Sequence, residues 1–485
     1  MRSTYSRSTG IRRLSSVGDP PSAEETINVG ASAGQLTIDI TQISGVDISA
    51  FYEIDIFFDQ VATQGAGTGV GKGVQVSTDG GSTFLATGYL DIIPNTAVNQ
   101  TMVLQQLAAG TFTSWCRLMN TNQTGIPCHF KNTYSGVSPT MGRVNSTTAV
   151  IDALRFIVKS DASSVTWLSG TIRIVGYRKP ALKTTTQTDS FDGIKTEIIF
   201  NIPSGHTVGY LEVEDVAASA PFGIVARMGN SGVFRATADH LRQRITSPLV
   251  GSQHVTDSIL FLTDSSVTQD ANCEFWNLNT AAPVIVASSM GDTGSEIRNL
   301  MMVPDETPFS QIRLFGFTGV AEKTLTAGTV RLTTYEVENT VFSWAPDGSA
   351  SHDFTGLGGF SGAVLTCPSL MVLSATDTIR ATVSGDVGAT DYRTHVSTVQ
   401  AQEVALRISE DTQTNARFSA VFTSLNSASV PTQMSWASNH NSSLIRQAAG
   451  VRDAAQKDTS IQVKTTGGAL MNSAPLPITL VGYKL

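Results

Sequence analysis

The chain has 485 residues, enough for about three domains of ordinary size, and only 15% of them are charged. Its formal net charge of −8 argues against a general binder of nucleic acid or of an anionic membrane, because phosphate groups need a concentrated basic face. No apolar run of about 18 residues is present, so the sequence predicts no membrane insertion. The 42 glycines and the many hydroxyl side chains are typical of antiparallel β-proteins, which have polar faces and tight turns.

Residues 1–27 are predicted to form an N-terminal arm. This segment has no hydrophobic periodicity and lacks the apolar stretch of a secretory signal. One interpretation is a disordered tail with incidental charge. The other, which we favour, is an anchor whose guanidinium groups form bidentate contacts with acidic grooves of a neighbouring protein. The anchoring candidates are Arg2, Arg7, Arg12 and Arg13.

The sequence STDGGSTF at residues 77–84 predicts a β-hairpin. Apolar and polar residues alternate before it, and Asp and Gly tolerate the positive φ angles that tight turns require. Asp79 could supply oxygen ligands to calcium, but a single acidic turn is a weak signal, and we expect a plain hairpin. The hairpin is duplicated at a constant offset of 150 residues: Gly73, Phe84, Ala86 and Thr87 recur as Gly223, Phe234, Ala236 and Thr237.

A closing phrase recurs three times along the chain. It reads GTIRIVGY at residues 170–177, GTVRLTTY at 328–335 and PITLVGY at 477–483, with its tyrosines 158 and then 148 residues apart. Its period-2 alternation predicts a strand with one face on a core and the other toward solvent. Ile172, Val330 and Ile478 are expected on the core side. Arg173, Arg331 and Thr479 are expected on the solvent side.

This repeat predicts an all-β chain of three tandem antiparallel, jelly-roll-like β-sandwich domains behind the arm. Repeats of about 20–50 residues form solenoids, whereas this period is the size of a self-sufficient domain. The predicted boundaries are residues 28–178, 195–336 and 339–485, with a linker at 179–194.

Three tryptophans and four cysteines are candidate functional residues. Trp115, Trp276 and Trp436 lie in comparable middle segments, where an exposed ring could stack on a sugar; a place in each core is the favoured interpretation. The other set is Cys116, Cys128, Cys273 and Cys367, which lack metal-site spacing. A bridge between Cys116 and Cys128 is one alternative, and buried thiols are expected instead.

The sequence contains no recognisable catalytic motif, so we expect no enzyme and no cofactor or metal. The stretch GAGTGVGK at residues 65–72 departs from a phosphate-binding loop at Ala66 and Gly73. Carboxylate pairs such as Glu212 and Glu214 would need a glycosidase geometry that sequence cannot supply, and solvated strand charges are the simpler interpretation.

Two of these segments resemble a domain of tailed-bacteriophage structural proteins. The first is STDGGSTF with Gly88 and Tyr89, and the second is NSTTAVIDALRFIVKS at residues 145–160, followed by SGTIRIVGY at 169–177. The resemblance covers roughly residues 28–178, and the later repeats inherit it only through the duplication. Most relatives of this kind carry one such domain, whereas this chain has three. The family pattern marks a scaffold and transfers no site residue.

The resemblance implies a virion structural protein, assembled in the host cytoplasm. We expect an N-terminally anchored fibre or head spike that displays its sandwiches, with a host-surface glycan as a further partner. Its arm would contact a portal, adaptor, tail or capsid protein, and a trimer is the favoured oligomer by analogy. A decoration protein lying flat on the capsid is the first alternative, and a polysaccharide-degrading spike is the second.

Overall fold

The computed structural model is nearly all β. It describes residues 23–51, 53–64, 71–91, 102–105, 110–119, 121–122, 128–133, 139–144, 147, 149–159, 166–177, 184–219, 222–234, 240–246, 250–256, 259–260, 268–291, 300–303, 308–317, 322–384, 392–396, 399–403, 405–408, 413–423, 425, 432–440, 444–452 and 458–484. No helix among these residues has the length and apolar character needed to cross a membrane.

The first sandwich consists of a large and a small antiparallel sheet. The large sheet runs β1 (Ala23–Asn28), β13 (Thr166–Tyr177), β5 (Glu53–Gln64), β9 (Gly110–Met119), β10 (His129–Thr133), β11 (Pro139–Val144) and β7 (Tyr89–Asp91). The small sheet runs β2 (Thr37–Ile40), β12 (Ala153–Lys159), β6 (Gly71–Ser77) and β8 (Met102–Gln105). Shorter elements are η1 (Val29–Ser32), β3 (Gln42–Ile43), β4 (Val46–Asp47) and η2 (Ile48–Ala50).

The second sandwich has the same plan. Its large sheet runs β14 (Thr184–Ser190), β27 (Ala327–Glu336), β16 (His206–Ala217), β22 (Thr268–Trp276), β23 (Val284–Gly291), β24 (Leu300–Val303), β19 (His240–Thr246) and β20 (Val250–Thr256). Its small sheet runs β15 (Glu197–Asn201), β25 (Gln311–Phe317), β17 (Gly223–Asn230) and β18 (Val233–Phe234), with β21 (Ile259–Leu260) on β17 and β26 (Glu322–Lys323) on β25.

The third sandwich repeats it again. Its large sheet runs β28 (Glu338–Trp344), β40 (Ile478–Lys484), β30 (Gly362–Asp377), β35 (Gln413–Thr423), β36 (Gln433–His440), β37 (Leu444–Arg452), β32 (Tyr392–Val396) and β33 (Val399–Glu403), with β39 (Met471–Ser473) on β30. Its small sheet runs β29 (Ser351–Thr355), β38 (Ser460–Thr465), β31 (Ile379–Val383) and β34 (Leu406–Arg407).

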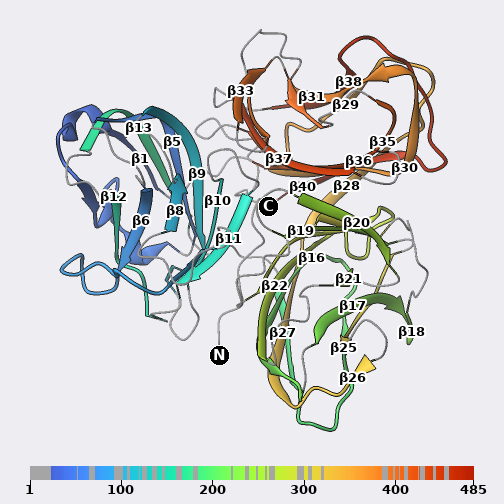
Figure 1. Ribbon diagram of the computed structural model, residues 1–485, viewed down its shortest axis with the longest axis horizontal. Helices are drawn as coiled ribbons and strands as arrows, with labels where there is room; N and C mark the ends of the chain where they lie inside the picture. The colour runs from blue at the N-terminus through green and yellow to red at the C-terminus, as the bar shows by residue number, and fades with distance from the viewer. Residues whose placement is uncertain are drawn as a thin grey trace. The chain divides into compact units, whose positions relative to one another are not determined.

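The strand order is that of a jelly roll, as the sequence predicted. In the first sandwich the chain passes repeatedly between two sheets that face each other, with the order β1-β13-β5-β9 in one and β2-β12-β6-β8 in the other (Figure 1). The same order recurs as β14-β27-β16-β22 with β15-β25-β17-β18, and as β28-β40-β30-β35 with β29-β38-β31-β34. Strands that are distant in sequence therefore become neighbours, which is typical of the double Greek key.

The inward faces of the two sheets form the core of each sandwich. In the first, Ile54, Ile56 and Phe58 of β5 pack with Ile172 and Ile174 of the closing strand. Phe58 and Phe156 meet edge to face at 5.6 Å between ring centroids. The core assignment of the closing phrase is confirmed, because Ile172, Val330 and Ile478 are all at most 1% exposed.

The solvent-facing assignment of the closing phrase is correct in part. Arg173 is about one-third exposed, but Arg331 and Thr479 are buried. Period-2 alternation identifies which residues share a face, yet it does not say whether the outer face is covered by other segments. The outer faces of β27 and β40 are therefore covered at these two positions, whereas that of β13 is open at Arg173.

Two predicted boundaries differ from the observed strands. Strand β1 begins at Ala23, inside the segment predicted as an arm, and β14 lies inside the predicted linker at residues 179–194. Both are edge strands, and the Thr-rich sequence of β14 resembles a polar linker although threonine favours strands. Contacts divide the chain into two compact units, the first chiefly Ser15–Ala181 and the second chiefly Leu182–Thr394 with Ala401–Leu485.

Candidate functional surface

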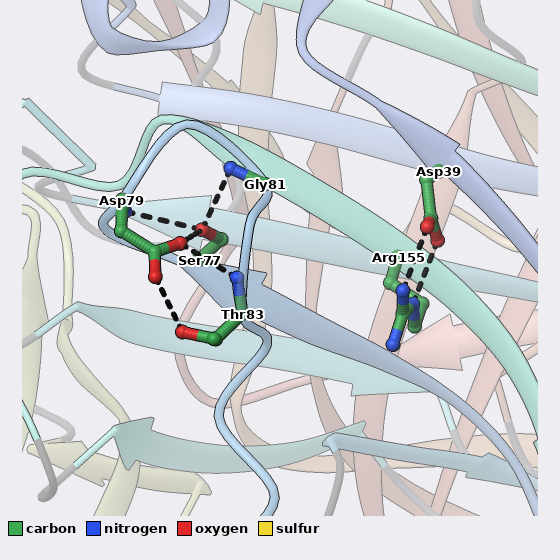
Figure 2. Close-up of polar contacts among 6 residues, drawn as sticks. All are labelled: Asp39, Ser77, Asp79, Gly81, Thr83 and Arg155. Atoms are coloured by element: carbon green, nitrogen blue, oxygen red, sulfur yellow. Dashed lines mark hydrogen bonds and ion pairs between the residues drawn. The ribbon is translucent and has the colours of Figure 1, made fainter.

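The turn after β6 is organised by the carboxylate of Asp79. Its Oδ1 accepts hydrogen bonds from the Ser77 hydroxyl and the Thr83 amide, both at 2.8 Å, and its Oδ2 accepts from the Thr83 hydroxyl at 2.5 Å (Figure 2). The Ser77 hydroxyl oxygen in turn accepts from the Gly81 amide at 3.0 Å. The side chains at both ends of this sequence therefore hold the turn closed.

Two glycines make this turn sterically feasible. Gly80 and Gly81 have φ angles of +73° and +81°, the left-handed region that favours glycine. The Gly80 amide donates to Asp152 Oδ2 at 2.8 Å, and this contact ties the turn to the residue before β12. The two segments that carry the phage resemblance, residues 77–84 and 145–160, thus meet in the structure.

The carboxylate of Asp79 is engaged by donors of its own turn. Hydrogen bonds from Thr83, and then from Ser77, lower the pKa of Asp79, so this exposed carboxylate stays ionised. Both of its oxygens already accept donors from the turn. Within the part of the chain that is described, no three His, Cys, Asp or Glu side chains are grouped to hold a metal ion.

Next to the turn, the outer face of the small sheet carries a charged clasp. Arg155 of β12 donates to both carboxylate oxygens of Asp39 on β2, each at 2.7 Å (Figure 2). The two residues are direct cross-strand partners. The guanidinium carbon also lies 4.0 Å from the ring centroid of Phe84, in cation–π geometry. Because Arg155 and Asp39 are 29% and 42% exposed, this clasp is accessible to solvent.

In the other two sandwiches a donor on the corresponding strand also binds an acidic residue of the edge strand. In the second, Arg313 of β25 pairs with Glu197 on β15 and donates to Glu322 at 2.9 Å. In the third, Gln462 of β38 donates to Asp353 on β29 at 2.8 Å, again between direct cross-strand partners. An acidic residue on the edge strand thus binds a donor on the next strand in every copy.

Charged and aromatic side chains lie together around the clasps of the first and second sandwiches. In the second sandwich, Arg313 and Arg227 lie 4.6 Å and 5.1 Å from the ring centroid of Phe315. Burial opposes the charge of Arg313, but Glu197 and Glu322 outweigh it and raise the pKa of that arginine. These groups fix the edge strand to its neighbour, and their exposed atoms are suited to polar recognition.

A second polar cluster is buried on the outer face of the first sandwich's large sheet. Arg117 of β9 contacts Asp55 through Nε at 2.6 Å and through Nη2 at 3.0 Å, and its Nε lies 3.2 Å from Glu53. All three side chains are at most 1% exposed. Burial alone lowers the pKa of Arg117, but Asp55 and Glu53 outweigh it and raise that pKa.

The three tryptophans do not occupy equivalent sites. Trp115 in β9 lies opposite Phe57, whereas Trp276 ends β22 opposite Val208. Trp436 belongs to β36, one strand further along, and its side chain lies outside the described residues. Trp115 is 6% exposed and Trp276 is fully buried, so neither presents an open ring face to a sugar.

The remaining candidates fall into two groups. All four cysteines are buried thiols. Burial raises the pKa of the Cys367 thiol to about 12, which keeps it protonated and unreactive at neutral pH. The arm arginines lie outside the described residues: Arg2, Arg7, Arg12 and Arg13.

Sequence reasoning missed the clasps and the buried Arg117 cluster. Their members are single charged or amide residues within strands. Apart from Arg313 and Glu322, which are 9 positions apart, each pair is separated by 62 to 116 positions, so no local pattern links them. One signal was available in the sequence. A charged residue between two apolar residues of a strand, such as Arg155 between Leu154 and Phe156, is expected on the face opposite to the core. That signal identifies one member of a pair and not its partner.

No family model matches the chain, and no curated protein matches its sequence. Domains LG4-5 of the mouse laminin alpha1 chain are 8% identical over 63% of this chain and 92% of that chain, with a TM-score of 0.18. A Sulfolobus turreted icosahedral virus structure is 10% identical over 64% and 90%, with a TM-score of 0.17. The PBSX exported protein XepA is 11% identical over 67% and 89%, with a TM-score of 0.15. Scores this low do not establish a common fold.

Proposed function

We propose that the protein is a structural component of a virus particle, an N-terminally anchored fibre or spike that displays its β-sandwiches for attachment to a host surface. The observation that carries the proposal is the use of one jelly-roll strand order three times in a single chain. Repeating a domain that folds by itself makes the folded part of the chain larger. It also presents the same type of surface several times.

The phage-like residues support this proposal through what they build. Asp79 and its neighbours stabilise a turn, and Arg155 joins two strands, so both segments serve the scaffold. In this proposal the arm binds another virion protein, the chain forms a homotrimer, and exposed polar groups of the clasps contact host glycan. The particle assembles in the host cytoplasm.

Deletion of residues 1–24 tests the anchor. Because β1 begins at Ala23, a second variant that lacks residues 1–22 keeps the whole strand and serves as the matched control. Both variants are expected to yield folded, soluble protein that is absent from purified particles. Normal incorporation of the chain lacking residues 1–22 would contradict the anchor.

Imaging of intact particles tests the mode of display. Density for the sandwiches that projects from a tail or vertex is the expected result. Sandwiches tiled flat on the shell would instead indicate a decoration protein. Release of sugars from host polysaccharide by the purified full chain would contradict a purely structural role.

A further inference from the structure

The outer faces of two large sheets meet in one buried apolar cluster inside the second compact unit. The second sandwich contributes Val208, Trp276, Ala282 and Tyr335, the connection to β28 contributes Val337, and the third sandwich contributes Val364, Val421, Val481 and Tyr483. Two of the three closing tyrosines therefore lie in the same cluster. This contact explains why the outer faces of β27 and β40 are buried.

Tyr483 makes the polar contact across this cluster. Its hydroxyl oxygen accepts a hydrogen bond from the Asn277 amide at 3.0 Å and donates to Asn277 Oδ1. Its ring meets Trp276 edge to face, with 5.2 Å between centroids and an interplanar angle of 68°. Residues 206 positions apart are joined by a hydroxyl that is fully buried.

The loop that contacts Tyr483, residues 277–283, has hydrogen bonds of its own. Asn277 has a φ of +64°, a left-handed conformation that asparagine tolerates better than most residues. Its side-chain amide donates to the Pro283 carbonyl at 2.8 Å, and its carbonyl accepts from the Thr280 hydroxyl at 2.8 Å. The backbone N–H and the side-chain Oδ1 of Asn277 both bond the Tyr483 hydroxyl.

Loss of this hydroxyl leaves a buried donor and a buried acceptor in the other sandwich. Burial raises the pKa of Tyr483, so its hydroxyl stays protonated and continues to donate. An unsatisfied buried polar group costs more than the net gain from an ordinary hydrogen bond. We infer that Tyr483 is an inter-domain lock that holds the second and third sandwiches as one rigid body and couples their opening.

The test is hydrogen exchange of the full chain with Tyr483→Phe. The substitution lies in the third sandwich and the readout lies in the second, in the peptide that covers residues 273–283. A loss of about 1.4 kcal/mol corresponds to exchange about tenfold faster, and this is the expected change. Unchanged exchange in that peptide would overturn the lock.

Tyr392→Phe is the matched control. Its hydroxyl is also buried in the third sandwich and bonds the backbone of Val383, with a distance of 2.9 Å to the amide. It is expected to speed exchange near β31 and leave residues 273–283 unchanged. An equal change at residues 273–283 in both variants would contradict a specific role for Tyr483.

Asn277→Gly tests the lock from the other side. Glycine accepts the left-handed backbone, so the side-chain contact is removed without new strain. Faster exchange in β40 of the third sandwich is expected. If this variant and Tyr483→Phe each alter only their own sandwich, the two domains open independently and the inference fails.

Discussion

The first and third sandwiches share a strand order but fill the outer face of their large sheets differently. In the first, this face holds Arg117, Asp55 and Glu53 in buried ion pairs. In the third, the hydroxyls of Thr366 and Thr479 bond each other at 2.5 Å, beside valines that contact the second sandwich. The jelly-roll order therefore fixes which strands are neighbours and leaves the chemistry of the outer face open.

The largest predicted effect follows from breaking the buried ion pairs. Arg117→Met is expected to destabilise the first sandwich by about 3–5 kcal/mol, because two buried carboxylates lose the guanidinium that neutralises them. The measurement is the denaturant midpoint of the full chain, followed by exchange of peptides in β5 and β9.

Two substitutions calibrate that result. Thr479→Val in the third sandwich removes a neutral hydroxyl pair and is expected to cost about 1 kcal/mol. Arg155→Met removes an exposed pair and is expected to cost no more than about 1 kcal/mol. If Arg117→Met lowered the free energy of unfolding as little as these two substitutions, burial would not increase the cost of breaking the ion pairs of Arg117.

The second-largest predicted effect concerns Gly170, which lies at a bulge in the pairing of β13 with β5. Gly170 has a φ of +109°, and a Cβ there would lie 2.5 Å from the Gln60 carbonyl oxygen and the Val61 Cα. Gly170→Ala should therefore destabilise the first sandwich by about 2–5 kcal/mol, from the left-handed backbone and from overpacking. The third sandwich builds this region differently, with the Leu476 amide donating to the Ser369 hydroxyl at 2.9 Å.

Gly34→Ala separates the two causes. Gly34 has a φ of +86°, but the space around its Cβ position is open. The expected loss in a thermal or denaturant melt is about 1–2 kcal/mol, from the backbone alone. Equal losses at Gly34 and Gly170 would contradict the close approach at Gly170.

The smallest predicted effect is a pH dependence of hydrogen exchange in the turn at residues 77–84. Hydrogen bonds lower the pKa of Asp79, so its contribution is complete above the ordinary value of 3.8 and is lost as the pH falls through the lowered value. Exchange in residues 77–84, corrected for the intrinsic rate, should therefore accelerate on acidification below 3.8. Asp79→Asn should flatten this response.

Asp347→Asn provides the comparison in the third sandwich. Asp347 is another exposed carboxylate whose pKa is lowered, by hydrogen bonds from Ser349. This variant should leave the response of residues 77–84 intact. If both variants flatten it, the acid sensitivity belongs to the whole chain rather than to the Asp79 turn.

The turn at residues 77–84 was predicted, but the strand expected after it is not formed: residues 84–88 contain no strand, and the next strand, β7, belongs to the large sheet. In the second sandwich the corresponding segment does form a hairpin, in which β17 pairs with β18.

The offset of 150 residues correctly links the segment that ends in Phe84 with the one that ends in Phe234. The left-handed pair is Gly80 and Gly81 in the first turn, but Ser231 and Gly232 in the second, one position later than the offset implies. The Asn230 side chain bonds the Pro308 carbonyl and the Ser310 amide, so contacts with a distant segment, which the offset does not encode, hold the second turn.

The sequence alone determined the all-β class and the core side of the closing strands, because alternation and turn residues act over a few positions. The domain-sized repeat predicted three jelly-roll-like copies, and the structure shows the strand order. The tertiary structure decided what covers the outer faces, where Trp115 and Trp276 lie, and which charges pair. Those outcomes depend on contacts such as that between Tyr483 and Asn277, which are 206 positions apart and leave no periodic signal. Local patterns specify a strand and its two faces, whereas long-range packing assigns each face its partner.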